Sequence, residues 1–164
     1  MNDELPGEQS FSQAAWILPS AAAILCLIAG AASGLISVEG GGVWYEKLNK
    51  PPGTPAASVF GPVWTVLYLM MGAAAGRLVH RRQWKAFWGF LIQLVLNLAW
   101  TPMFFGAHQI VPALGIIAIL GLILGWTIRE AEHSDKVSAY LLLPYLLWVG
   151  YATYLNAGIA WLNR

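Results

Sequence analysis

The stretch from Gln93 to Phe105 reads QLVLNLAWTPMFF and carries polar side chains inside a long apolar run. At about 100° per residue, one narrow stripe of a helix would hold Gln93, Asn97, Trp100 and Phe104. An amide that faces lipid is costly, because hydrocarbon offers it no hydrogen-bond partner. We therefore expect this stripe to face other protein, a cavity or a ligand, with the remaining helices arranged around it.

The composition is that of an integral membrane protein. The chain has 164 residues, of which 58% are hydrophobic and only 10% are charged, and its mean hydropathy is +0.60. Soluble domains carry about 25% charged residues. The apolar runs extend over roughly 20 residues, as spanning helices require, whereas barrel strands alternate over about 10. We expect an all-α membrane protein, and the net charge of +1 without a basic run argues against a nucleic-acid partner.

Five apolar segments predict a five-helix transmembrane bundle in a single domain, residues 14–164, after a polar N-terminal tail, residues 1–13. The expected spans are about residues 14–38, 57–79, 86–105, 110–128 and 137–161. Three consecutive glycines are expected to end the first helix, and the prolines that follow cannot continue one. The resulting loop, residues 39–56, is either a cover over a ligand site or a solvated linker with interfacial tryptophan anchors.

Small residues recur at every fourth position of the first span, where helices can approach closely. They are Ala22, Cys26, Gly30 and Gly34. Two interpretations stay open, namely packing within the chain and the seam of a homodimer. Because five spans place the termini on opposite sides, the excess of Lys and Arg in the connections after spans two and four predicts a cytoplasmic N-terminus.

The spans lack the groups that most membrane chemistry needs. Neither an acidic residue nor Lys, Arg or His lies near the middle of a span, which argues against a pump or a proton-coupled transporter. No cluster of Cys and His suggests a metal site, so we expect no metal and no required cofactor. Flat rings and neutral amides suit a large, planar, mostly apolar ligand, and lysines in the first loop could meet its carboxylates.

Several motifs occur in order between residues 43 and 161. They are Trp44-Tyr45 with Leu48 and Lys50-Pro51; Gly61-Pro62-Val63-Trp64 with Leu67-Tyr68; Gln93-Leu94 with Asn97, Trp100 and Pro102; Phe104-Phe105-Gly106; and Pro144-Tyr145 with Trp148, Ala152-Thr153 and Leu155-Asn156. In these motifs and their spacing, the chain resembles the translocator protein family, also called tryptophan-rich sensory protein or peripheral benzodiazepine receptor.

The resemblance, which is to bacterial-type members, implies a five-helix bundle with a pocket under the first loop. We expect a homodimer in a bacterial cell membrane. It implies binding of protoporphyrin IX and haem-like tetrapyrroles, of isoquinoline and benzodiazepine drugs, and in animal members of cholesterol. Two departures stand out. Gly53 occupies a place where many members carry an aromatic residue, and the next basic residue after Tyr154 is Arg164, too distant for the animal sterol motif.

The resemblance also implies which residues touch the ligand. The aromatic pair at 44 and 45 would cover the pocket, the third helix would form a wall, and a small residue on the fifth helix would leave room. The expected ligand-binding residues are Trp44, Tyr45, Pro51, Trp64, Tyr68, Asn97, Trp100, Phe104, Trp148 and Ala152.

Three functions remain open at the level of sequence. The first is a membrane translocator or sensor that binds tetrapyrroles. The second is an enzyme, since Trp64 and Trp148 match the two tryptophans proposed for light-driven porphyrin breakdown in some bacterial members. The third is a passive carrier or scaffold in which the aromatic stripes are ordinary core. We expect the first, because the chain offers no separate acid, base or metal for catalysis.

Overall fold

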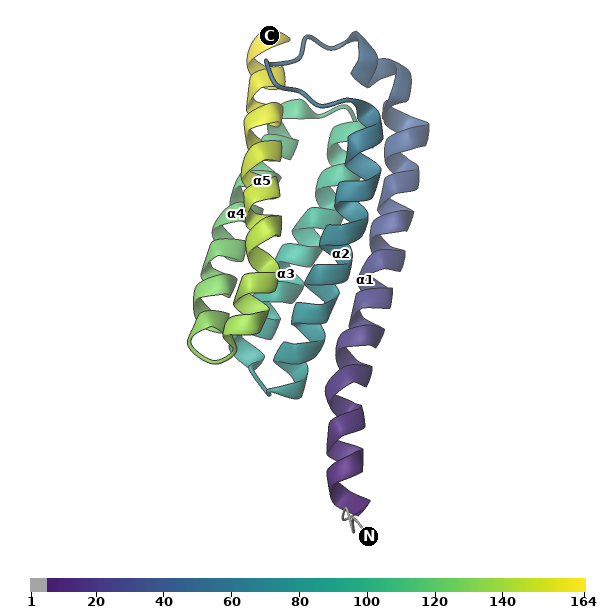
Figure 1. Ribbon diagram of the computed structural model, residues 1–164. Coiled ribbons are helices and arrows are strands. Elements are labelled where there is room, and N and C mark those ends of the chain that lie inside the picture. The colour runs from purple at the N-terminus through teal and green to yellow at the C-terminus, as the bar shows by residue number, and fades with distance from the viewer. Residues whose placement is uncertain (1–5) are drawn as a thin grey trace.

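Helices make up every regular element of the protein that the computed structural model describes (Figure 1). The description covers the backbone of residues 6–164 and the side chains of residues 16–35, 37 and 42–164. The elements are α1 (Pro6–Lys47), α2 (Ala57–His80), α3 (Trp84–Thr101), the short π-helix η1 (Pro102–Gly106), α4 (Ile110–Glu132) and α5 (Lys136–Leu162). The expected all-α class is thus confirmed.

The first helix differs from its predicted bounds at both ends. It begins at Pro6 rather than near residue 14, so part of the predicted tail is helical, while residues 1–5 of that tail lie outside the described residues. It also runs through the three glycines to Lys47. Each glycine costs a helix about 1 kcal/mol, but the end of α1 packs its aromatic pair against η1, and this tertiary contact outweighs the local preference. The predicted loop 39–56 shortens to residues 48–56.

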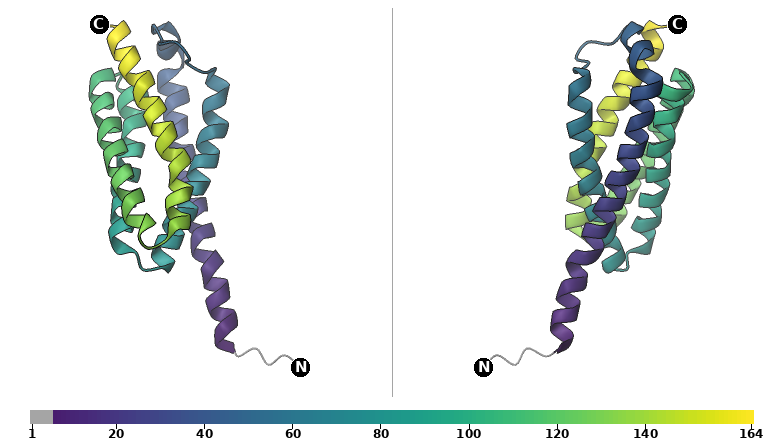
Figure 2. Two further views of the ribbon diagram at one scale, coloured as in Figure 1. Left: turned by 60° about the vertical axis from the view of Figure 1, so that its left-hand side comes forward. Right: turned by 90° about the vertical axis from the view of Figure 1, so that its right-hand side faces the viewer.

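The five long helices form a closed ring in the order α1, α2, α5, α4, α3 (Figures 1 and 2). The turns after α2, η1 and α4 span only residues 81–83, 107–109 and 133–135, so successive helices run antiparallel. The third and fourth helices, which the turn 107–109 joins, pack against each other. The first turns of α1 extend beyond the rest of the bundle, and the start of α1 and the C-terminus lie at opposite ends of the molecule.

Small residues hold α1 against α2. A Cβ added at Gly72 would overlap the backbone of Ala22 and Ala23, and one added at Gly30 would overlap the Tyr68 ring. Most of the small-residue face of α1 is therefore used within the chain, which confirms the packing interpretation there. Gly34 is different, because nothing lies within 4 Å of its added Cβ.

The exterior is apolar, as an integral multi-pass membrane protein requires. Four segments within the described helices are long and apolar enough to cross a bilayer, namely Trp16–Leu35, Ala57–His80, Trp84–Gly106 and Ile110–Glu132. Five were expected. α5 falls outside this group because four tyrosines, Pro144 and Asn156 lower its hydropathy, although Leu147 on its outer face is 75% exposed.

Candidate functional site

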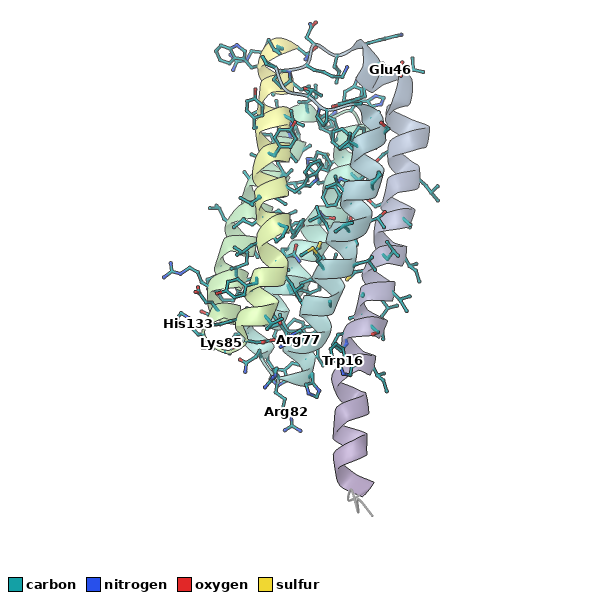
Figure 3. All side chains as sticks on the ribbon, viewed as in Figure 1. Trp16, Glu46, Arg77, Arg82, Lys85 and His133 are labelled. Carbon is teal, nitrogen blue, oxygen red and sulfur yellow. The ribbon has the colours of Figure 1, made fainter. Side chains whose placement is uncertain are left out.

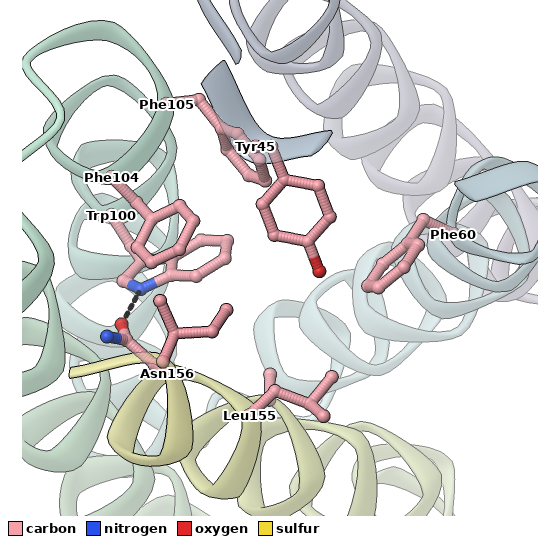
Figure 4. A pocket seen from close by; sticks show the side chains of 9 residues that line it. Tyr45, Phe60, Trp100, Phe104, Phe105, Leu155 and Asn156 are labelled. Atoms are coloured by element: carbon pink, nitrogen blue, oxygen red, sulfur yellow. Dashed lines mark hydrogen bonds between the residues drawn. The ribbon is translucent and has the colours of Figure 1, made fainter. Parts of the chain in front are cut away.

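A small cavity lies at the end of the bundle that holds η1, the end of α1 and the loop 48–56, which we call the cavity end (Figure 4). Its volume is about 30 Å³, room for about two water molecules. Its lining residues are Tyr45, Phe60, Trp100, Phe104, Phe105, Ala152, Leu155, Asn156 and Ile159. Rings and aliphatic groups from α1, α2, α3, η1 and α5 therefore converge on one point.

The third-helix wall is built by a change of helical type. Pro102 has no backbone N–H to donate, and the α-helix gives way there to the wider π-helix. Such π segments are frequent at functional sites. Trp100 stacks on Phe104 with centroids 5.3 Å apart and planes 20° apart, and Phe105 meets Phe104 edge-on at 4.8 Å. The wall is thus a compact group of three rings.

A hydrogen-bond chain holds the indole of Trp100 in place. Its Nε1 donates to Oδ1 of Asn156 over 3.1 Å, and Nδ2 of Asn156 donates to the carbonyl oxygen of Ile110 over 2.9 Å. Asn156 is almost fully buried. The two amide ends are thereby both used, and the ring orientation that faces the cavity is set by α5 and the start of α4.

Tyr45 forms the roof of the cavity. Its ring lies 5.6 Å from that of Phe105, and its hydroxyl group points into the hollow (Figure 4). That hydroxyl has no hydrogen-bond partner among the described residues. Burial, followed by the electrostatic effect of Tyr151, raises the pKa of Tyr45, so the group stays protonated and can donate a hydrogen bond at physiological pH.

The lysine beside this roof is already engaged. Nζ of Lys50 lies 4.8 Å from the centroid of the Tyr45 ring and donates to the carbonyl oxygens of Glu46 and Leu48, over 3.2 and 3.3 Å. It therefore caps the end of α1, where carbonyl groups lack helical partners. Lys47 is exposed and makes no such contact with the described residues.

The loop 48–56 is tied along α5 by neutral contacts. Asn49 and Asn163 exchange two hydrogen bonds of 3.0 and 2.9 Å, and the Pro51 ring packs on Gly158. Two tyrosine hydroxyls of α5 donate to loop carbonyls: Tyr154 to Pro52 over 3.0 Å, and Tyr151 to Gly53 over 2.6 Å. These ties hold the loop beside the cavity.

Glycine is required in this loop by backbone geometry. Gly53 has a φ of +82°, which L side chains rarely adopt, and the backbone N–H of Thr54 closes the turn onto the Pro51 carbonyl over 3.3 Å. An aromatic residue here would strain the turn that presents the Gly53 carbonyl to Tyr151.

A second polar group lies deeper in the bundle. Oδ1 of Asn97 accepts from the Tyr68 hydroxyl over 2.5 Å, and Nδ2 of Asn97 donates to the Tyr145 hydroxyl over 2.9 Å. Gln93, on the same stripe, is fully buried and has no partner within the described structure. The stripe thus faces protein as expected, but its first half is used in the core.

Comparison with known proteins identifies the family to which this chain belongs. Residues 22–162 match the TspO/MBR family. The chain belongs to this family. It is 36% identical to the "Tryptophan-rich protein TspO" of Chlorobaculum tepidum over 145 residues, 85% of this chain and 91% of that protein. It is 37% identical to the "Translocator protein" of Homo sapiens over 132 residues, 73% and 75% of the two chains. "Protein CrtK" of Rhodobacter capsulatus is 31% identical over 147 residues, 85% and 89% of the two chains.

In this TspO/MBR protein, the ten expected ligand-binding residues divide into two groups. Those that line the cavity are Tyr45, Trp100, Phe104 and Ala152. Those that do not are Trp44, Pro51, Trp64, Tyr68, Asn97 and Trp148. Trp44 stacks instead on His108, with centroids 4.2 Å apart, and so lies beside the roof. The roles of all ten in ligand binding stay predictions.

Trp64 and Trp148, the two tryptophans expected to matter if the protein is an enzyme, contact each other. The rings of Trp64 and Trp148 are perpendicular, with centroids 6.4 Å apart. Trp148 also lies 5.9 Å from Phe60, which lines the cavity. Nε1 of Trp148 is buried without a partner in the described structure. Phe60 therefore links this pair to the lining of the cavity.

Five lining residues were absent from the predicted set: Phe60, Phe105, Leu155, Asn156 and Ile159. Three of them follow Ala152 at helical spacings of three, four and seven, so the face of α5 could have identified them. Phe60 lies one turn before Trp64 and is brought to the cavity by the packing of α2 against α5, which a single sequence does not reveal.

Proposed function

We propose that this TspO/MBR protein is a membrane translocator or sensor that binds a tetrapyrrole, such as protoporphyrin IX or haem, at the cavity end. The observation that carries the proposal is the convergence of Tyr45, Trp100 and Phe104 on a hollow beside Ala152. Stacked rings with one free hydroxyl suit a flat, largely apolar molecule with a polar edge. The Tyr45 hydroxyl would meet that edge, and Lys47 would meet carboxylates at the membrane surface.

A porphyrin is much larger than about 30 Å³, so its binding must displace the roof. The ties between the loop 48–56 and α5 are suited to this, because they are neutral hydrogen bonds at exposed or partly exposed sites. Each such bond stabilises by about 1 kcal/mol. In this proposal the loop 48–56 detaches from α5, and the end of α1 with Tyr45 moves with it. The ligand then enters between the loop and the start of α2.

The proposed topology has five spans, with α5 as the fifth. α5 lies beside α2 and α4 along most of the bundle, so a bilayer that contains those helices contains α5 too (Figures 1 and 2). The excess of basic residues at the end opposite the cavity supports a cytoplasmic N-terminus, in a bacterial cell membrane. The cavity end would then face outward.

The proposed assembly is a homodimer. Gly34 supports it, because this position on the small-residue face of α1 is left open by the chain itself. The native thiol, Cys26, is buried, so a Gly34→Cys variant presents one accessible thiol. Oxidative crosslinking at this position and none at an exposed control, Leu147→Cys, is the expected result. Equal crosslinking at both positions would count against this seam.

The binding proposal is tested by tryptophan quenching during titration with protoporphyrin IX. Ala152→Leu fills the hollow and is expected to raise Kd on the order of tenfold, while the fold survives because a void is filled. Ala157→Leu adds the same atoms to an exposed position of the same helix and serves as the control. If the wild-type protein shows no saturable quenching, or if both variants bind with equal affinity, the proposed site is wrong and a scaffold function becomes the better explanation.

The perpendicular contact of Trp64 and Trp148 favours a second candidate, photo-oxidative porphyrin breakdown. A light-excited porphyrin would accept an electron from a nearby indole, and molecular oxygen would act as the terminal oxidant. Illumination of the complex should bleach the porphyrin bands faster than illumination of porphyrin in empty vesicles. If the bleaching is unchanged in a Trp64→Phe, Trp148→Phe double variant, the two indoles take no part in it and it is ordinary photodamage.

A further inference from the structure

The end of the bundle opposite the cavity, which we call the basic end, carries a concentration of positive charge. It comprises the turns 81–83 and 133–135 and the helix ends beside them. Its basic residues are Arg77, Arg81, Arg82, Lys85, Arg129 and Lys136, and its acidic residues are Glu130, Glu132 and Asp135. Figure 3 shows Arg77, Arg82, Lys85 and His133 gathered there.

The one buried carboxylate of this end is already neutralised. Arg77 donates to both oxygens of Asp135, with Nε 3.0 Å and a terminal nitrogen 2.8 Å from them. Asp135 is only 7% exposed, and Ser138 donates to it as well. The exposed cations of the α2–α3 turn therefore have no ion-pair partner among the described side chains.

The backbone of that turn presents Arg82 to the outside. The N–H of Gln83 bonds to the Leu78 carbonyl over 2.8 Å and that of Arg82 to the Val79 carbonyl over 3.0 Å, which is the pattern of a Schellman helix end. Arg82 takes the left-handed position with a φ of +55°, where glycine is the usual residue. Its side chain points away from the bundle (Figure 3).

Aromatic rings beside these cations mark the depth of the membrane interface. Trp84 and Trp88, on the first two turns of α3, are 51% and 62% exposed, and Phe87 contacts both rings. Exposed tryptophans in membrane proteins are enriched at the level of the lipid headgroups, with their apolar parts against the chains. Arg82 and Lys85 therefore project to where the phosphates of the leaflet lie.

We propose that the α2–α3 turn is a binding site for the headgroups of anionic phospholipids, in which Arg82 and Lys85 hold the phosphate and Trp84 and Trp88 lie against the acyl chains. Arg81 adds positive charge, part of which acts on the carboxylate of Asp135. Clusters of basic residues directly beside a transmembrane helix attract anionic lipid in this way. The site is independent of the cavity, since it lies at the other end of the bundle.

Native mass spectrometry of the purified full chain tests this site, with phosphatidylglycerol and phosphatidylcholine of identical acyl chains offered together. The wild type should retain phosphatidylglycerol preferentially, and Arg82→Gln with Lys85→Gln should lower that preference on the order of tenfold. Arg129→Gln with Lys136→Gln removes the same charge from the same end and should leave the preference within about twofold.

Three outcomes would overturn the proposal. They are equal retention of both lipids by the wild type, an equal loss in the two double variants, and full displacement of the lipid by millimolar glycerol phosphate, which would indicate a site for soluble phosphates. Arg82→Gly separates binding from folding, because glycine suits the left-handed position. It should weaken the lipid preference while the melting temperature stays unchanged or rises. Titration with protoporphyrin IX should be unaffected in every variant.

Discussion

The two ends of the bundle are closed by different chemistry. At the basic end, turns of three residues join the helices, and the Arg77–Asp135 ion pair ties α2 to the turn before α5. At the cavity end, a loop of nine residues is tied to α5 by neutral hydrogen bonds. Breaking a largely buried ion pair costs several kcal/mol, whereas an exposed hydrogen bond costs about 1 kcal/mol or less. The contacts that close the basic end are therefore stronger than those that hold the loop at the cavity end.

The largest effect is expected from the helix contact that anchors α1. Gly72→Leu would drive a side chain into the backbone of Ala22 and Ala23 and should cost at least about 3 kcal/mol, because backbone cannot move aside as a side chain can. Gly115→Leu, on the exposed face of α4, meets open space and should leave stability unchanged or raise it by up to about 1 kcal/mol, because glycine is a poor helix former. Thermal unfolding in detergent, followed by tryptophan fluorescence, measures both. Similar melting temperatures would show that the α1–α2 contact is looser than described.

The next effect comes from the ion pair of the basic end. Arg77→Ala leaves the carboxylate of Asp135 buried without its partner and should lower stability by about 2–3 kcal/mol, less than for a fully buried pair because the Arg77 side chain is 28% exposed. Arg82→Ala, on the exposed turn, is the matched control and should be nearly silent in the same unfolding assay. An Arg77→Ala variant with unchanged stability would show that the contacts at the two ends do not differ in strength.

Acid should loosen the basic end selectively. Burial by itself raises the pKa of Asp135, but hydrogen bonds from Arg77 and Ser138 and the charges of Arg77 and Arg81 lower it overall. A lowered pKa stabilises the fold above the unfolded value of about 3.9, and this contribution is lost as pH falls through the folded pKa. The melting temperatures of wild type and Asp135→Asn should therefore converge below about pH 4. A constant gap down to pH 3 would contradict this assignment.

The smallest effect on stability, and the clearest on opening, is expected at the loop. Tyr151→Phe with Tyr154→Phe removes two hydroxyl donors to loop carbonyls but keeps the rings, and should cost less than about 1.5 kcal/mol in total. The loop 48–56 should then exchange its amide hydrogens several-fold faster, because less free energy holds it on α5. Tyr140→Phe, at the opposite end of α5, controls for the loss of a hydroxyl. Unchanged exchange would mean that the Asn49–Asn163 hydrogen bonds and the packing of Pro51 on Gly158 hold the loop without the tyrosines.

Much of the helical framework follows from local properties of the chain. The observed α2, α4 and α5 lie within a few residues of the segments expected from hydropathy alone, since apolar length and short polar turns are local features. The close packing at Gly30 was also predictable, because small residues on a helix face allow close approach whatever the partner. The end of α1 could not be predicted in this way. The glycines indicate that the helix ends there, but the packing of Trp44 and Tyr45 against η1 extends it to Lys47.

The site was less accessible to prediction than the fold. A polar stripe on α3 shows only that Asn97 and Trp100 face inward, and it cannot say which partner each meets. In the folded chain, Tyr68 and Tyr145 use both ends of the Asn97 amide, while Trp100 turns to the cavity. The identity of hydrogen-bond partners depends on the rotation and depth of three helices, which are set by packing.

By itself, the sequence determined that this protein is a helical membrane protein of the TspO/MBR family, with a face of rings and amides turned inward, because hydrophobic length, residue size and the cost of unpaired amides act along the chain. The tertiary structure alone decided that α1 runs to Lys47, that Phe60 reaches the cavity and Asn97 does not, and that the hollow measures about 30 Å³. Those outcomes depend on how residues far apart in the chain fill one shared space, and local pattern carries no information about that.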